Sequence, residues 1–363
     1  MKVPYIYTIF LFISIICRPT AIHGADEISG TDEADRDTMA LKVGKGFNLF
    51  GAEEPLQITL TFDIRKFLNT KSTPEYFDAT ITIKSDDSTS ITRNIKLKAR
   101  GEMRREYCDF PPILLKFKED DNEPERILGN RKFKLVTHCK LSSLHEKYVL
   151  KEYLVYRLYN QVTPYSFRTR LAEINYVDIN KPDRAFSTYG FLIEDEDAMA
   201  ERIKAVPYDN LNLTQKHMVP VEMVRTALFQ YMIGNTDWGV SNQHNVRILK
   251  SMELLTDKAI PVVYDFDYSG FVSTNYAIPA QELPIDLVTE RYYLGICAPK
   301  EVVAKVVDEF GTLKGQFLTT IGTFDFLPED SRKQAESYIN SFYKMYKNQK
   351  TLINTINNSC KSF

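Results

Sequence analysis

The chain has 363 residues, with 46 basic and 48 acidic side chains and 44% hydrophobic residues. The near-zero net charge excludes a strongly basic nucleic-acid binder, so we expect no nucleic-acid partner, and the hydrophobic content excludes a disordered chain. The length is compatible with one large domain or with two closely packed lobes.

The N-terminus has the pattern of a secretory signal. Lys2 precedes an apolar stretch over residues 5–17, and small residues follow up to Ala25. The alternative is an uncleaved membrane anchor, but the stretch is shorter than the ~20 residues that a bilayer requires. We predict a signal peptide over 1–25, a flexible acidic linker over 26–44, and a mature protein without a stable membrane span that is secreted or lies in the periplasm or cell envelope.

Four cysteines remain after the signal: Cys108, Cys139, Cys297 and Cys360. An even number in an exported chain is compatible with two disulfides, for which three pairings exist. Cys108 with Cys139 is favoured because each lies near a strand pattern that could pair with the other. Four buried free thiols are the alternative.

The segment 45–195 has mostly strand patterns. Apolar and polar residues alternate from Leu56, Tyr76 and Ile91, with turn-rich segments between them, which predicts an antiparallel sheet. Further strand patterns lie in "ILLKFK" and "RKFKLV", and a strand pair follows in "RLAEINYVDI" and "YGFLIED". A helical period from Ser143 onward, in "LHEKYVLKEYLVYRLYNQV", interrupts these strands.

The segment 196–363 has mostly helical patterns. One helix begins at Pro220 and is expected to end at Gly234, a typical C-terminal capping residue. The part from residue 287 onward is also predicted to be helical, with a polar tail. We therefore expect a β-rich N-terminal lobe and a mostly helical C-terminal lobe, with a ligand site in the cleft between them.

The segment after the Pro220 helix, "GNTDWGVSNQHNVRIL", is rich in oxygen-bearing side chains. Asp237, Asn242 and Asn245 precede a short strand pattern, and a second strand pattern ends at Asp265 and Asp267. Mg²⁺ prefers such ligands and is often shared between one or two carboxylates and substrate phosphates. Each residue alone is more typical of a turn or cap, but the ordered set predicts a phosphoryl-transfer site. Asp267 is a second candidate ligand because strand alternation places it on the same face as Asp265.

Residues 76–270 resemble the CotH-like (spore coat protein H-like) group of atypical kinases. The segments "PEYFDATITI", "NIKLKARGE", "FPPILLKFK" and "YGFLIED", and then "GNTDW" and "VVYDFDYSG", occur in the order of that family. The resemblance implies an α+β, two-lobed protein-kinase-like fold that binds ATP and Mg²⁺.

Carried over by motif, the resemblance makes Asp237 the catalytic-loop aspartate and Asp265 the magnesium aspartate. The metal asparagine stays open between Asn242, which keeps the offset from Asp237 found in kinase loops, and Asn245, which directly precedes the strand.

The resemblance also implies a nucleotide-binding set. Lys116 would be the strand lysine that contacts the phosphates, with Lys118 and Lys134 as rivals, and Glu152 would be its helix partner. Arg100, at the Arg-Gly end of the second strand, joins the cofactor-binding residues.

The chain departs from the family where "RGEMRREYCDF" replaces Arg-Gly-Asn-Ser, so a small-residue loop over the phosphates is lost or replaced. Trp238 also follows the loop aspartate where Arg is usual. Two functions are open. The leading one is a secreted, Mg-dependent, ATP-using phosphotransferase that acts on a protein hydroxyl, and the alternative is a catalytically silent kinase-fold binding protein of the cell envelope or surface.

Overall fold

The computed structural model describes residues 49–73, 75–84, 90–117, 132–208, 210, 212–346 and 349–360. The predicted signal peptide and linker, residues 1–44, lie outside the described residues, as does Lys118.

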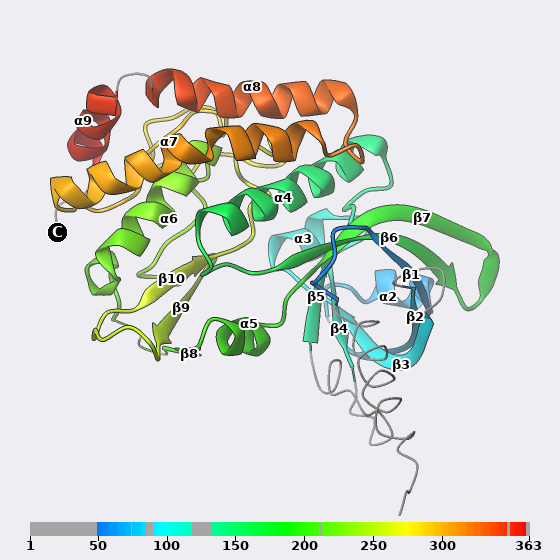
Figure 1. The fold of residues 1–363 in the computed structure, drawn as a ribbon. Helices are drawn as coiled ribbons and strands as arrows, with labels where there is room; N and C mark the ends of the chain where they lie inside the picture. Colours follow the sequence, from blue (N-terminus) through cyan, green and yellow to red (C-terminus); the bar gives the residue numbers. More distant parts are fainter. Residues whose placement is uncertain are drawn as a thin grey trace, which may run out of the picture. The chain divides into compact units, whose positions relative to one another are not determined.

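Seven strands form a closed barrel in the first half of the described chain (Figure 1). They are β1 (Leu56–Phe62), β2 (Phe77–Lys84), β3 (Ser90–Ala99), β4 (Ile113–Lys116), β5 (Lys132–Val136), β6 (Thr169–Asp178) and β7 (Lys181–Ile193). The order around the barrel is β1-β2-β3-β4-β5-β7-β6, and every pairing is antiparallel except that of β6 with β1. The alternating apolar residues of these strands fill the interior, as the sequence pattern predicts.

The expected α+β, two-lobed protein-kinase-like fold is wrong, because the barrel closes. Parallel pairing places Leu56 beside Ala172 and Ile58 beside Ile174, so the edges of β1 and β6 are joined rather than left at the ends of an open sheet. Closure removes unpaired backbone groups from the sheet and buries the apolar faces of both strands. Residues 46–363 group as one compact unit and not as two lobes.

Two helices flank the candidate site from the barrel side. The short α3 (Met103–Tyr107) follows β3, and the long α4 (Ser143–Val162) follows β5. The hydroxyl of Ser142 accepts a hydrogen bond from the backbone N–H of His145 and so caps α4. Helix α4 packs against β7 on one side and α7 (Lys300–Gly322) on another, which explains why most of its circumference is apolar (Figure 1). The barrel also carries α2 (Ile64–Asn69), and α5 (Glu196–Arg202) follows β7.

The second half of the chain has helices around a small sheet. The three-stranded sheet has the order β10-β9-β8 and consists of β8 (Ala205–Pro207), β9 (Val246–Ser251) and β10 (Ile260–Val263). The short 3₁₀ helix η1 (Gln215–His217) precedes α6 (Pro220–Ile233), and α8 (Glu329–Tyr346) and α9 (Gln349–Ser359) follow α7. As predicted, α6 starts with Pro220 and is capped by Gly234, which takes a left-handed conformation with φ of 65°. Among the described residues, no helix combines the length and apolar character needed to cross a membrane.

Two disulfides form, and one of them is the favoured pairing. Cys108 is bonded to Cys139 and Cys297 to Cys360. The first joins the end of α3 to the segment after β5, where Phe110 also makes a backbone bridge to Cys139, so the strand-pairing argument for this bond is confirmed. The second fixes the C-terminal end of α9 to the segment before α7.

Candidate functional site

The loop after α6 and the segment after β10 are held side by side by backbone hydrogen bonds. Gly270 N donates to Gly234 O, and Tyr264 N donates to Asn245 O, each at 3.0 Å. These bonds bring the oxygen-rich loop that begins after Gly234 next to Asp265 and Asp267, as the sequence order predicts.

Asp237 is at the centre of a hydrogen-bonded group in this loop. Its Oδ1 lies 2.8 Å from His244 Nε2, and its Oδ2 accepts from Asn245 Nδ2 at 3.0 Å. Asn245 Nδ2 also donates to the Asp237 carbonyl at 2.9 Å. The amide nitrogen of Asn245 is used in this way, which leaves its amide oxygen as the atom of this side chain that could serve as a metal ligand.

Asn242 lies differently. Its Oδ1 accepts from His244 N at 3.3 Å, and a Cβ built on Gly239 would lie only 2.4 Å from the same oxygen. Asn242 therefore folds back over its own turn, where an asparagine commonly stabilises a loop. Of the two asparagines, the structure places Asn245 and not Asn242 against Asp237.

Asp265 has a backbone conformation that is unusual for a residue with a side chain. Its φ is 63°, in the left-handed region, and its N–H donates to the hydroxyl of Tyr156 at 2.9 Å. Non-glycine residues in this region carry a conformational cost and are often found at functional sites. The hydrogen bond to Tyr156 on α4 fixes the backbone conformation from which the half-buried carboxylate of Asp265 extends.

Asp267 is buried and lies among charged groups. Its Oδ2 accepts from the hydroxyl of Tyr276 at 2.9 Å and is 3.8 Å from Arg104 Nη1. Burial, together with the negative charges of Asp265 and Asp237, raises the pKa of Asp267 to about 6, although Arg104 and Tyr276 act in the opposite direction. Burial and the neighbouring carboxylates therefore outweigh the stabilisation that Arg104 and Tyr276 give the ionised form of Asp267.

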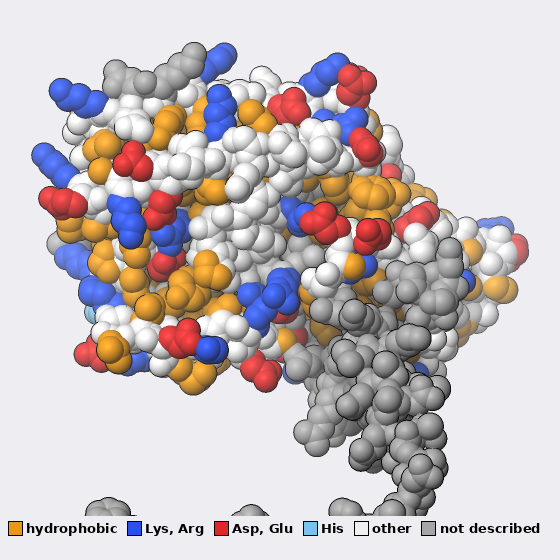
Figure 2. Space-filling view, in the orientation of Figure 1, with side chains coloured by type: hydrophobic (Ala, Val, Ile, Leu, Met, Phe, Trp, Pro, Cys, Tyr) orange, Lys and Arg blue, Asp and Glu red, His pale blue; other side chains and the backbone are white. Residues whose placement is uncertain are grey.

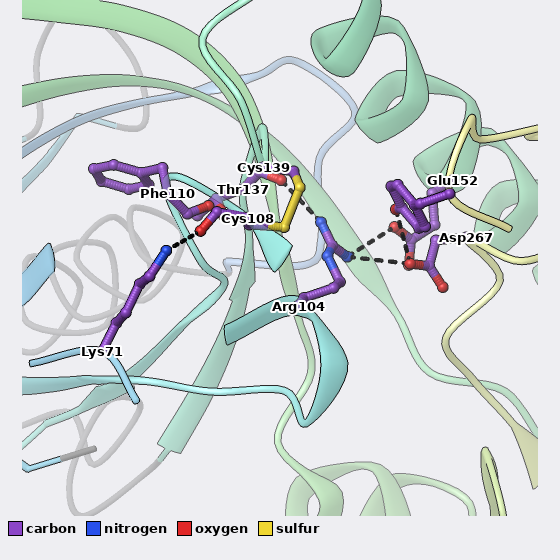
Figure 3. Close-up of a disulfide and its surroundings, with 9 residues drawn as sticks. Lys71, Arg104, Cys108, Phe110, Thr137, Cys139, Glu152 and Asp267 are labelled. Carbon is purple, nitrogen blue, oxygen red and sulfur yellow. Dashed lines mark hydrogen bonds and ion pairs between the residues drawn. A yellow bond between two sulfur atoms is a disulfide. The ribbon is translucent and has the colours of Figure 1, made fainter. Parts of the chain in front are cut away.

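Arg104 links Asp267 to Glu152 (Figure 3). Arg104 Nη1 is 3.7 Å from Glu152 Oε2, and Nη2 donates to the Thr137 carbonyl at 3.0 Å. Figure 3 shows the guanidinium pointing between these groups, next to the Cys108–Cys139 disulfide that closes α3. Burial and the neighbouring Asp267 raise the pKa of Glu152 well above its usual range, against the effect of Arg104.

The expected pair of Lys116 and Glu152 is not among the described contacts. Lys116 is on the outer face of β4, in register with Lys96 and Lys132, and its Nζ is 5.7 Å from the ring centroid of Tyr76. The partner of Glu152 is instead Arg104. The separation has a simple cause, since Lys116 is at the end of β4 that lies away from α3.

Lys134 on β5 is the lysine that faces the candidate site. Its Nζ is 4.7 Å from the ring centroid of Tyr264, the residue before Asp265. Burial and the positive charges of Arg100 and Arg247 lower the pKa of Lys134 to about 8, while Asp265 has the opposite influence. Three cationic side chains, those of Lys134, Arg100 and Arg247, therefore lie near Asp265.

Sequence reasoning missed Arg104 and gave Lys134 only as a rival, whereas His244 was expected to hold the loop by hydrogen bonds, as it does. The signal for Arg104 is its position four residues before Cys108, because a disulfide-fixed short helix can carry a side chain inward. His244 lies one residue before Asn245, and the tight turn between Asp237 and Asn245 is what brings it back to the aspartate.

We expect Asp267→Asn to stabilise the metal-free protein by about 1–2 kcal/mol at pH 7.5. The pKa of Asp267 is higher in the folded than in the unfolded protein, so the folded state favours the protonated carboxyl. The resulting contribution to stability is fully present below the unfolded pKa near 4 and is lost as the pH rises through about 6, where the buried carboxylate ionises. The gain should therefore disappear by pH 4. Urea unfolding at both pH values measures it, and a loss of stability at pH 7.5 would mean that the ionised carboxylate is already compensated.

Among the described residues, no group of three His, Cys, Asp or Glu side chains could hold a metal ion by itself. Mg²⁺ does not require one, because phosphates and water commonly complete its coordination. Searches against protein-family models and against curated proteins find no match for this chain.

Proposed function

We propose that this protein binds a nucleotide together with Mg²⁺ and transfers a phosphoryl group to a hydroxyl of a protein acceptor. The observation that carries the proposal is the adjacency of two oppositely charged groups. An acidic group consists of Asp237, Asp265, Asp267 and Glu152, and a basic group consists of Lys134, Arg100 and Arg247. Asp265 acts electrostatically on members of both groups.

A metal-bound polyphosphate matches this arrangement. A divalent cation would offset the burial and the neighbouring negative charges that together raise the pKa values of Asp267 and Glu152. The phosphates would offset the burial and the neighbouring positive charges that together lower the pKa of Lys134. We assign Asp265 and the amide oxygen of Asn245 to the metal, with Asp267 as a further ligand.

Asp237 fits the role of the group that orients the acceptor hydroxyl and accepts its proton. Its two carboxylate oxygens are fixed by His244 and Asn245, so its direction is set before any substrate arrives. Mg²⁺ would supply charge neutralisation at the transferred phosphoryl group. The proposal rests on this geometry and not on the fold, and the motif resemblance over residues 76–270 adds support.

The alternative is a binding protein without turnover. One observation favours it: both oxygens of Asp237 already have side-chain partners in the loop, as expected of a carboxylate that holds a turn together. A further feature fits it too, because α3 brings Arg104 into the acidic group where the family has a small-residue loop.

Isothermal titration with Mg-ATP tests nucleotide binding, with two lysines as a matched pair. Lys134→Met keeps most of the apolar stem but removes the charge, and we expect it to weaken binding by at least tenfold, within the range for a charged contact. Lys116→Met, on the same outer face of the barrel, should leave binding within about twofold. Asp265→Ala should remove the magnesium dependence.

If Lys116→Met weakened binding and Lys134→Met did not, the phosphate-binding site would lie near Lys116 and not near Lys134. No heat with any nucleotide would reject the proposed function in both its catalytic and its nucleotide-binding form. Binding of Mg-ATP without transfer to any acceptor hydroxyl would favour the silent binding protein.

A further inference from the structure

A cavity lies apart from the candidate site, between three segments of the chain. Residues 50–55 before β1 form one side, the C-terminal half of α4 and the loop up to Thr169 form the floor, and α7 with the loop up to Phe326 forms the other side. Its volume is about 1320 Å³. None of the acidic or basic groups described above lines it. The cavity therefore needs an explanation of its own.

The α7 wall of this cavity has a composition that is unusual for a solvent-facing helix. It is formed by Thr312, Gly315, Gln316, Thr319, Thr320 and Thr323, none of which is charged. Threonine and glycine lower helix propensity, and exposed helix faces normally carry Lys and Glu. The middle of the face in Figure 2, over α7 and α4, is largely neutral, and charged side chains lie around it.

Gly315 shows that packing does not explain this choice. A Cβ built at Gly315 would meet no heavy atom within 4 Å, so a larger residue would fit the fold. No neighbouring atom requires a glycine at this position of α7, and the space beside Gly315 is left open. That space is part of the cavity.

Two buried polar atoms along the floor have no partner within the described protein. Thr169 is 8% exposed, and its Oγ1 makes no hydrogen bond. The Oε1 of Gln161 is also buried and unpartnered, although its Nε2 donates to Thr320 Oγ1 at 2.7 Å across the floor. Buried polar atoms are rarely left unsatisfied, so these two indicate a ligand that both donates and accepts hydrogen bonds.

Several charged side chains line the cavity. Arg157 pairs with Glu53, Arg202 pairs with Glu194, and the exposed Glu54 also lines the cavity. The exposed guanidinium of Arg168 makes no ion pair or side-chain hydrogen bond to the described residues, and it lines the same cavity. An acidic substituent on a ligand would find its partner there.

An exposed aromatic ring completes the lining. Phe326 is 39% exposed, and its ring centroid is 5.5 Å from that of Phe324, which itself lies 5.7 Å from Tyr153. Such a ring, supported from behind, offers a flat apolar surface beside hydroxyl and amide groups.

We propose that this cavity binds an acidic oligosaccharide. Sugar hydroxyls donate and accept at once, as the unpartnered Thr169 and Gln161 atoms require. The apolar face of a pyranose ring packs on Phe326, and Arg168 binds a carboxylate or sulfate. Single small-molecule sites usually occupy ~300–1,000 Å³, so the larger volume accommodates several linked rings.

The test is isothermal titration of the mature chain with defined hexamers. The probes are an oligogalacturonate, a heparin-derived hexasaccharide, neutral chitohexaose and hexaglutamate. At least one acidic hexasaccharide should bind with a Kd below ~1 mM. Chitohexaose lacks the acidic groups and hexaglutamate lacks the sugar rings, so each should bind at least about tenfold more weakly.

Gly315 provides a matched pair of variants. Gly315→Trp fills the cavity and should weaken binding of the acidic hexasaccharide by at least about tenfold, whereas Gly315→Ala should leave it within about twofold, since its methyl group meets open space. Arg168→Gln should lower affinity for the acidic probe but not raise affinity for chitohexaose. Thermal unfolding by circular dichroism checks that each variant is folded.

Three outcomes would overturn the proposal. These are no binding of either acidic hexasaccharide below ~1 mM, equal binding of hexaglutamate, and unchanged binding by folded Gly315→Trp. If Arg168→Gln bound the acidic probe with full affinity, Arg168 would not be the partner of the ligand's carboxylate or sulfate. Mg-ATP titration of the same variants should be unchanged, which separates this site from the proposed phosphotransferase site.

Discussion

Arg104→Ala is expected to lower the free energy of unfolding by about 3–5 kcal/mol at pH 7.5. Arg104 is the cation that both Glu152 and Asp267 face, and all three side chains are at least nine-tenths buried. The desolvation cost of the two carboxylates would then be uncompensated. Both pKa values are already raised, and loss of Arg104 would raise them further.

The pH dependence identifies this cause. Carboxyls with raised folded pKa values contribute stability that is fully present below their unfolded pKa near 4 and is lost as the pH rises. The difference between Arg104→Ala and the parent should therefore be largest above neutral pH and smaller at pH 4.5. Urea unfolding followed by circular dichroism gives the comparison.

Arg105→Ala is the matched control, because Arg105 is on the same short helix but its side chain bonds to the carbonyls of Gly101 and Ser72. It should cost about 1 kcal/mol at either pH. Adding Glu152→Gln to Arg104→Ala should recover part of the loss by removing one buried charge. Equal effects of the two arginine variants at both pH values would contradict the electrostatic explanation.

Local pattern was sufficient for much of the chain. The helix from Pro220 to the capping Gly234 followed from residue types alone, and the strand alternation after Leu56 correctly indicated the interior face of the sheet. The Cys108–Cys139 bond followed from neighbouring strands. In each case the information lies within about one structural element.

Long-range pairing was the part that local pattern could not give. β1 and β6 are separated by more than one hundred residues and pair in parallel. The alternating pattern of a strand does not indicate which other strand it pairs with. Barrel closure therefore overturned the expected two-lobed fold. The same limit explains the lysines, because "ILLK" and "KFKLV" both alternate well, and only the barrel order shows that Lys134 and not Lys116 faces Tyr264.

Under the proposed function, Asp237→Ala should reduce phosphoryl transfer by at least about a thousandfold while leaving Mg-ATP affinity within a few fold. Asp237 touches the acceptor in this mechanism, and the nucleotide is held by other groups. Single-turnover transfer and isothermal titration on the same preparation measure the two quantities separately.

The neighbouring residues of the loop distinguish this role from a structural one. Asn245→Ala should weaken nucleotide binding and raise the magnesium requirement together, since its amide oxygen is assigned to the metal and its amide nitrogen holds Asp237. Asn242→Ala removes only a turn hydrogen bond worth about 1 kcal/mol, so its transfer rate and affinity should match the parent. If Asp237→Ala and Asn245→Ala behaved like Asn242→Ala, the loop would be a structural turn. The acidic and basic groups would then need another explanation, because a phosphoryl-transfer site at this position requires the aspartate that faces the acceptor.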